Sequence, residues 1–267
     1  MDTLLNFLFI QRDLLLTLEI HMKNISKILA SLLVAISFNI YSDHHEMPNF
    51  TPAQGGLSVI TINTDNPADY VGWLKKSTPV FAEAWGDNVA SSGICTPISG
   101  GEREGNHYVW SLSPSLAATM ASVPGSDTSI DKAVKKISKK RTVERRDVYE
   151  VIKTTSQVNI AGQLTAQYNL LSTPSNVSAY VEAISAMESA AAKNGFSDVE
   201  IAVFQASGAG DRAGMVMASV QAPSTQRLGD FLSQRNAGWM AEAMKDFPSL
   251  RKSEHDWLLN CEVIYNN

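Results

Sequence analysis

The chain has 267 residues, 44% of them hydrophobic and 18% charged, so its length admits one large domain or two small ones. Its net charge of −5 at pH 7 lacks the positive electrostatic footprint of a nucleic-acid binder, and we expect no nucleic-acid partner. The basic residues gather within 132–146, which we interpret as a solvated helix face rather than a patch for an anionic partner.

The N-terminal part of the sequence predicts export. Two lysines precede Ile28–Ile40, an apolar run of 13 residues, and polar residues follow it. This is the shape of a secretory signal peptide, and the run is short for a membrane span. We expect Met22 to be the true start, residues 1–42 to be an upstream segment and signal peptide, and residues 43–55 to form a flexible leader. The mature protein is then periplasmic or secreted, with no membrane span after cleavage; an uncleaved N-terminal anchor is the alternative.

The next part of the chain predicts six elements in the order strand, helix, strand, strand, helix, strand. They are expected at 57–63, 66–86, 92–98, 106–112, 115–140 and 146–153. The first helix has the clearest limits, because Asn66 suits the N-cap, Pro67 the first helical position and Gly86 the end. The glycine-rich stretch 99–105, which lies between two strand-like runs, predicts a β-hairpin.

The rest of the chain repeats this order. Its elements are expected at 164–172, 176–195, 200–205, 215–221, 224–248 and 255–265. A shift of 109 residues places Gly101–Gly105 on Gly210–Gly214, and both stretches read G-[E/D]-R-x-G. We interpret them as repeated hairpin tips, whose glycines supply positive φ, rather than as phosphate-binding loops. The sequence therefore predicts a duplication, with modules at 56–155 and 163–267.

Each module has the element order of the split βαβ, or ferredoxin-like, fold, with sheet order 4-1-3-2 and both helices on one face. The predicted fold class is α+β: two tandem βαββαβ ferredoxin-like modules packed sheet to sheet as a pseudo-dimeric barrel. In this order and in its G-[E/D]-R-x-G turns, the chain over about residues 56–265 resembles the dimeric α+β barrel superfamily in its fused, tandem form. The resemblance implies no single activity, because the superfamily includes small monooxygenases, haem-degrading enzymes and dismutase-like haem proteins.

The third strands of the two modules differ, and the difference points to candidate ligand-binding residues. Tyr108 aligns with Met217. Two residues further along, Trp110 aligns with Ser219. Strand alternation directs these side chains toward the space between the two sheets. Two large aromatic side chains there suit a small ligand, although aromatic residues fill ordinary cores more often than they bind ligands.

Two histidines and their neighbours are weaker candidates. A haem ligand requires a histidine on the wall of the cleft, and His107 and His255 are the candidates beyond the leader. His255 lies two residues before Trp257, and Arg146 holds the equivalent place in the first module. We retain all four as ligand-binding candidates, with a structural role for His107 as the alternative. The sequence contains no recognisable catalytic motif, so no catalytic residue is assigned, and no metal is expected.

The resemblance also bears on the two cysteines of the chain. Cys95 is expected on the second strand of the first module, and Cys261 on the last strand of the second. In the fused barrel these strands run side by side, so a disulfide is one hypothesis and two buried free thiols are the other. A bridge would close a loop of about 165 residues, worth roughly 4–5 kcal/mol in the chain-entropy model.

Three functions stay open at this point. The first is an exported protein without evident catalysis, which binds a small apolar or aromatic ligand or a partner in the cleft. The second, implied by the resemblance, is a monooxygenase-like enzyme that is cofactor-free or uses haem. The third is a structural or interaction module with a packed interior. An open pocket lined by Tyr108, Trp110, Trp257 and a histidine would favour the first two. A tandem copy supplies its own partner, so we expect a monomer or a weak homodimer.

Overall fold

The computed structural model describes residues 55–122, 128–156 and 158–267. The predicted signal peptide and nearly all of the predicted leader lie outside these residues. The boundary predicted between the two modules falls in the segment that joins the fourth strand, which ends at Lys153, to the fifth, which begins at Leu164.

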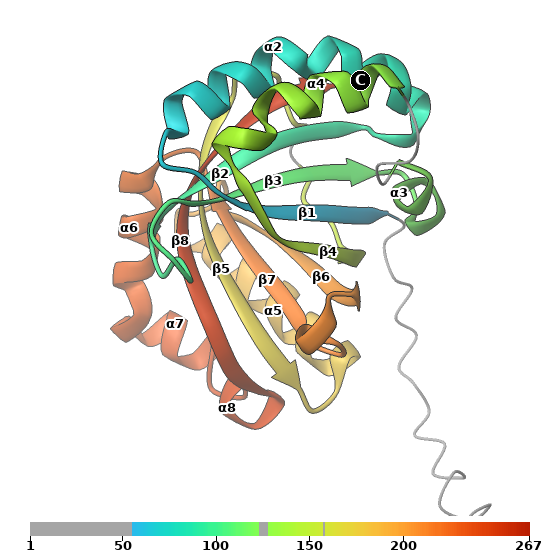
Figure 1. The fold of residues 1–267 in the computed structure, drawn as a ribbon. Helices are drawn as coiled ribbons and strands as arrows, with labels where there is room; N and C mark the ends of the chain where they lie inside the picture. Colours follow the sequence, from blue (N-terminus) through green and yellow to red (C-terminus); the bar gives the residue numbers. More distant parts are fainter. Residues whose placement is uncertain (1–54, 123–127, 157) are drawn as a thin grey trace, which may run out of the picture. The chain divides into compact units, whose positions relative to one another are not determined.

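The centre of the fold is a closed barrel of antiparallel strands (Figure 1). Its strands are β1 (Gly56–Asn63), β2 (Ser91–Ser99), β3 (Asn106–Ser113), β4 (Thr142–Lys153), β5 (Leu164–Pro174), β6 (Glu200–Gly208), β7 (Val216–Ala222) and β8 (Arg251–Asn266). They are hydrogen-bonded around the barrel in the order β1-β3-β2-β8-β5-β7-β6-β4. Closure leaves none of these strands with a free edge.

The strand order divides the barrel into two halves that meet along two seams. The first half reads β4-β1-β3-β2 and the second reads β8-β5-β7-β6. One seam joins β2 to β8, where Cys95 is paired with Cys261, and the other joins β4 to β6. The two half-sheets therefore face each other across the interior and are hydrogen-bonded along both pairs of edges.

Helices cover the outside of the barrel (Figure 1). They are α2 (Pro67–Trp85), α3 (Leu116–Ser122), α4 (Thr128–Ile137), α5 (Val177–Lys193), α6 (Thr225–Leu232), α7 (Gly238–Ala243) and α8 (Phe247–Leu250). The predicted N-cap of α2 is confirmed, because the side chain of Asn66 accepts a hydrogen bond from the backbone N–H of Asp69. Asn176 and Ser224 cap α5 and α6 in the same way.

The last helical stretch differs from its prediction. The sequence predicted one helix that ends at Pro248, whereas the structure has α6, a 3-10 turn, α7 and α8. Pro248 lies in the first turn of α8, where its missing N–H leaves no hydrogen bond unmade, so it begins a helix rather than ending one. The final strand is also longer than predicted: β8 begins at Arg251, because its polar first residues continue the pairing with β5 as far as Pro174.

Strand alternation separates two kinds of core. Val216, Ala218 and Val220 of β7 point outward and pack under the helices of the second half. Met217 and its neighbours of the same parity point inward and belong to a separate cluster inside the barrel. The inward cluster is the one that surrounds the candidate site.

Candidate functional site

A cavity of about 230 Å³ lies inside the barrel, and every strand contributes to its wall. Its middle section is apolar and strongly aromatic. The large side chains there are Tyr108, Trp110, Tyr149, Phe204, Met217 and Trp257. The rings of Tyr108 and Trp257 meet edge to face, with their centroids 6.3 Å apart. Such an arrangement offers a hydrophobic ring face and a ring edge to a ring-shaped molecule.

Trp110 fits against β2 because that strand has a glycine beside it. A Cβ atom built on Gly93 would lie only 2.5 Å from Cζ2 of the indole, which is closer than atoms can approach. The absence of a side chain at Gly93 therefore gives the Trp110 ring its place in the cavity wall.

One end of the cavity is charged, and Arg212 forms its boundary. The guanidinium donates hydrogen bonds to Glu102 and, at 3.4 Å, to Asp147, and it lies 5.2 Å from the ring centre of Trp257. Arg145 completes the cluster, since its Nε is 2.8 Å from both carboxylate oxygens of Asp147. Its Nη2 also bonds to Asp211 at 2.7 Å. The cluster thus neutralises each cation with carboxylates of the protein.

This charged end is built by the two repeated turns. Glu102 comes from the first G-[E/D]-R-x-G stretch and Arg212 from the second, so their ion pair joins the two hairpin tips. Gly105 and Gly214, which close the two turns, have φ angles of 81° and 78°. On its outer side Arg212 borders a second, open hollow that also contains His255 and Glu254.

The opposite end of the cavity is polar and uncharged. It is lined by Ser113, Thr154, Thr155, Asn159, Thr165 and Gln167. Three of these residues come from the segment between β4 and β5, namely Thr154, Thr155 and Asn159. The side chain of Asn159 donates a hydrogen bond of 2.9 Å to the hydroxyl of Ser91, which lies on β2. The cavity therefore passes from neutral polar groups, through an aromatic middle, to a closed ion cluster.

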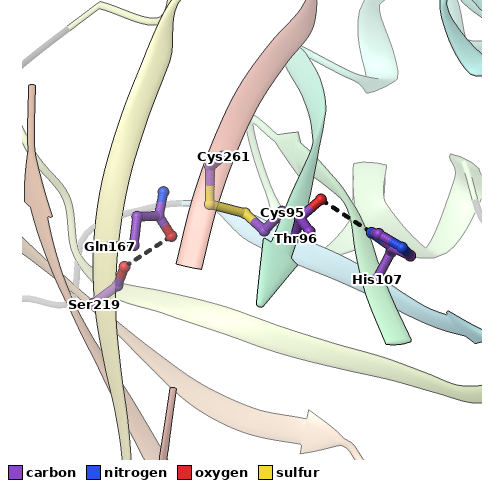
Figure 2. The surroundings of a disulfide bond; sticks show 6 residues. All are labelled: Cys95, Thr96, His107, Gln167, Ser219 and Cys261. Carbon is purple, nitrogen blue, oxygen red and sulfur yellow. Dashed lines mark hydrogen bonds between the residues drawn. A yellow bond between two sulfur atoms is a disulfide. The ribbon is translucent and has the colours of Figure 1, made fainter. Parts of the chain in front are cut away.

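A disulfide joins Cys95 to Cys261 across the seam between β2 and β8. Figure 2 shows this bridge between two hydrogen-bonded pairs of side chains. On the cavity side, Ser219 donates to the side-chain oxygen of Gln167 at 3.3 Å. The disulfide is deeply buried, and Cys95 itself forms part of the cavity wall.

Comparison with protein-family models and with curated proteins finds no match. Among solved structures, a chlorite dismutase variant from Candidatus Nitrospira defluvii matches with a TM-score of 0.51 at 12% identity, over 80% of this chain and 93% of that one. A protein described as a monooxygenase from Fusobacterium nucleatum matches at 0.49 and 11% identity, over 80% and 95%. A haem-binding protein from Thermus thermophilus matches at 0.48 and 7%, over 79% and 94%. The chain has the dimeric α+β barrel fold.

In this dimeric α+β barrel, three of the residues proposed from the sequence lie together. Tyr108, Trp110 and Trp257 all line the cavity. Arg146 does not: it is exposed on the outer face of β4, next in sequence to the Arg145 of the ion cluster. The sequence also did not single out Arg212, although it lies in one of the recognised repeats, or Phe204 and Asn169, which have no local signal.

The two histidine candidates lie outside the cavity wall. His107 is buried on the outer face of β3, with its Nδ1 atom 3.0 Å from the hydroxyl of Thr96 (Figure 2). His255 stands at the charged end, where its Nε2 atom is 2.8 Å from the carbonyl oxygen of Gly100 and its ring packs against Trp257. The described residues around the cavity therefore do not fit a haem held by histidine, which needs an imidazole pointing into the pocket.

Burial sets the protonation of the groups around the cavity. It raises the pKa of Tyr108 and of Tyr149 above the ordinary value of 10.0, and the nearby Glu102 adds to the effect at Tyr108. Burial also raises the pKa of Asp147, against the opposing effect of Arg145. The two phenols thus stay neutral near pH 7 and are not poised to take a proton. Among the described residues there is also no cluster of side chains suited to holding a metal ion.

Proposed function

We propose that this protein binds a small, mostly apolar ring compound inside its barrel and performs no chemistry on it. The observation that carries the proposal is the cavity of about 230 Å³ with Tyr108, Trp110 and Trp257 in its wall. Native interiors have few voids larger than a water molecule, and an engineered apolar cavity of roughly 150 Å³ admits benzene. A cavity of this size and lining therefore suits a one- or two-ring molecule.

The two other candidate functions have less support. A structural module would fill its interior, and this interior has space enclosed by large side chains. An enzyme of the monooxygenase-like or haem-dependent kind has the support of fold likeness alone, since the matching structure is a chlorite dismutase variant of 12% identity. Among the described residues that line the cavity, the haem-dependent form would find no histidine and the cofactor-free form no group that can act as a base near pH 7.

We make two further proposals, one about how the barrel is built from the chain and one about where the protein is located. We infer that the halves β1–β4 and β5–β8 are two tandem ferredoxin-like modules, as their repeated element order suggests. We infer also that the protein is exported, because disulfides persist in oxidising compartments and the barrel contains one. None of the helices in the described part of the chain is long and apolar enough to cross a membrane.

Equilibrium dialysis against naphthalene tests the binding proposal. We expect one molecule bound per chain, and we expect Ala202→Phe to abolish binding, because Ala202 is buried in the cavity wall and the added ring would occupy the space. The matched control is Ile98→Phe, which adds a ring at a side chain that is 52% exposed. Equal binding by both variants, or no binding by the parent protein while its thermal unfolding is cooperative, would refute the proposal.

A further inference from the structure

Four polar atoms of residues in the wall of the cavity are buried and have no hydrogen-bond partner. They are the indole Nε1 atoms of Trp110 and Trp257, the hydroxyl of Ser113 and the side-chain oxygen of Asn169. Asn169 and Ser113 are only 9% and 5% exposed. A buried polar atom left without a partner costs about 1–3 kcal/mol, so native proteins leave few of them. Their gathering in one cavity indicates that a bound molecule supplies the missing partners.

The donor and acceptor character of these atoms defines what the bound molecule must offer. The Asn169 oxygen accepts a hydrogen bond, so it requires an O–H or N–H group. The indoles of Trp110 and Trp257 can only donate, so each requires an oxygen or nitrogen acceptor. The Ser113 hydroxyl satisfies either kind of group. A hydroxyl on an apolar ring provides both functions, since its hydrogen can be given to one residue while its oxygen accepts from another.

Asn169 is also placed where such a group would meet the aromatic surface. On β5 it is paired with Ser219 of β7 on one side and with Trp257 of β8 on the other. Ser219 already donates to Gln167 and leaves the Asn169 oxygen without a donor. A ring lying against Trp257 therefore brings its substituents near the free oxygen.

The charges around the cavity exclude an ionised ligand. Of the described residues that line the cavity, Arg212 alone is charged, and its guanidinium is already bonded to Glu102 and Asp147. An anion would find no free cation here, and burying an unpaired charge is costly. A cation would lie near Arg212, which also covers the Trp257 ring that could otherwise attract it.

We propose that the ligand of this cavity is an uncharged hydroxylated ring compound of the phenol or naphthol class, oriented by Asn169 as acceptor and Trp110 as donor. This inference rests on the proposed function and specifies its ligand. It assigns orientation and selectivity to two residues, each with a side-chain polar atom that has no hydrogen-bond partner in the protein.

Three two-ring probes of matched size test the inference by equilibrium dialysis at pH 7: naphthalene, 2-naphthol and the anion 2-naphthoate. We expect 2-naphthol to bind about tenfold more tightly than naphthalene, and 2-naphthoate to bind more weakly than both. In Asn169→Leu the advantage of 2-naphthol should disappear while naphthalene binds at least as well as before. Trp110→Phe should reduce the same advantage by about three- to tenfold.

Asn260→Leu is the matched control, because Asn260 is an exposed asparagine of the barrel wall on β8 and should leave all three affinities unchanged. Equal binding of naphthalene and 2-naphthol would overturn the inference and leave the binding function intact. The inference would also be overturned if Asn169→Leu weakened the binding of naphthalene and 2-naphthol equally. Failure of all three probes to bind would instead overturn the proposed function itself.

Discussion

Among single residues, His107, which lies outside the cavity, shows how burial favours the neutral form of an imidazole. It is 3% exposed, and burial lowers its pKa from the ordinary value of 6.5. The unfolded chain takes up a proton at this residue below about pH 6.5, whereas the folded chain does so only at lower pH. The unfolded state then binds more protons, so the stabilising contribution is present above pH 6.5 and is lost as the pH falls toward the folded pKa.

We therefore predict that His107→Gln reduces the loss of stability on acidification. In the parent protein the free energy of unfolding should fall as the pH drops below about 6.5, and the variant should lack the part due to His107. Urea titrations at a series of pH values from 7.5 to about 5 measure the effect. His255→Gln, which changes the histidine at the charged end of the barrel, should retain the His107 component. The same pH slope in His107→Gln and the parent would contradict the prediction.

Some residues of the cavity wall could be predicted from the sequence and others could not. Strand alternation is a local rule, so the inward direction of Tyr108 and Trp110 followed once the strand was recognised. Asn169 was missed because its importance depends on having no partner, which only the packing of other strands decides. Arg146 was proposed because a shift of 109 residues places it on His255, but Arg146 is exposed on the outer face of β4, and its neighbour Arg145 is the residue that bonds to Asp147.

At the scale of elements, the two hairpin tips perform different tasks despite their shared pattern. Arg212 of the second tip is largely buried, with a side chain that is 12% exposed, and it bonds to both Glu102 and Asp147. Arg103, its counterpart in the first tip, is 69% exposed and pairs with Glu144 at the surface. The shared G-[E/D]-R-x-G pattern could be recognised in the sequence. Which of its two arginines is buried depends on the contacts between the two hairpin tips, which the pattern does not specify.

This difference gives a prediction with an internal control. Arg212→Met should lower the free energy of unfolding by roughly 2–3 kcal/mol, because it leaves a buried carboxylate and a partly buried one with fewer partners. Arg103→Met removes the equivalent residue of the other tip and should cost less than about 1 kcal/mol, as surface ion pairs do. Urea unfolding of the two variants beside the parent measures both values. Similar losses of unfolding free energy in the two variants would show that the buried ion cluster stabilises the protein no more than the surface ion pair does.

Element boundaries were less predictable than element order. The repeated pattern in the sequence predicted the order of strands and helices, but β8 extends beyond its apolar residues because its partner β5 continues. The helices after β7 are short and interrupted, although the sequence was interpreted as one continuous helix across the breaks. For β8 the limit is therefore set by the neighbouring strand rather than by the residues at the limit itself.

At the scale of the whole molecule, the barrel exists only when its two halves close on each other. Each half contributes two edge strands, and closure pairs β2 with β8 and β4 with β6. The cavity wall draws on all of these strands, so a ligand site inside the barrel requires both seams. The order of elements predicted this closure through the fold it resembles, whereas the size of the space inside depends on side chains from every strand.

The disulfide should contribute strongly to the stability of this closed form. It links residues separated by 166 positions, and a loop of that length corresponds to about 5 kcal/mol of unfolded-state entropy in the chain-entropy model. We predict that a reductant lowers the urea midpoint of the parent protein substantially, with the full loss in Cys95→Ala/Cys261→Ala. The double variant should not respond to reductant, which separates the effect of the bridge from any general effect of the reagent.

The denaturant slope of the double variant should also be larger than that of the parent, since an unfolded chain without the bridge exposes more surface. An unchanged midpoint on reduction, with two free thiols counted in the unfolded and reduced protein, would show that the seam between β2 and β8 is held by its hydrogen bonds and packing alone.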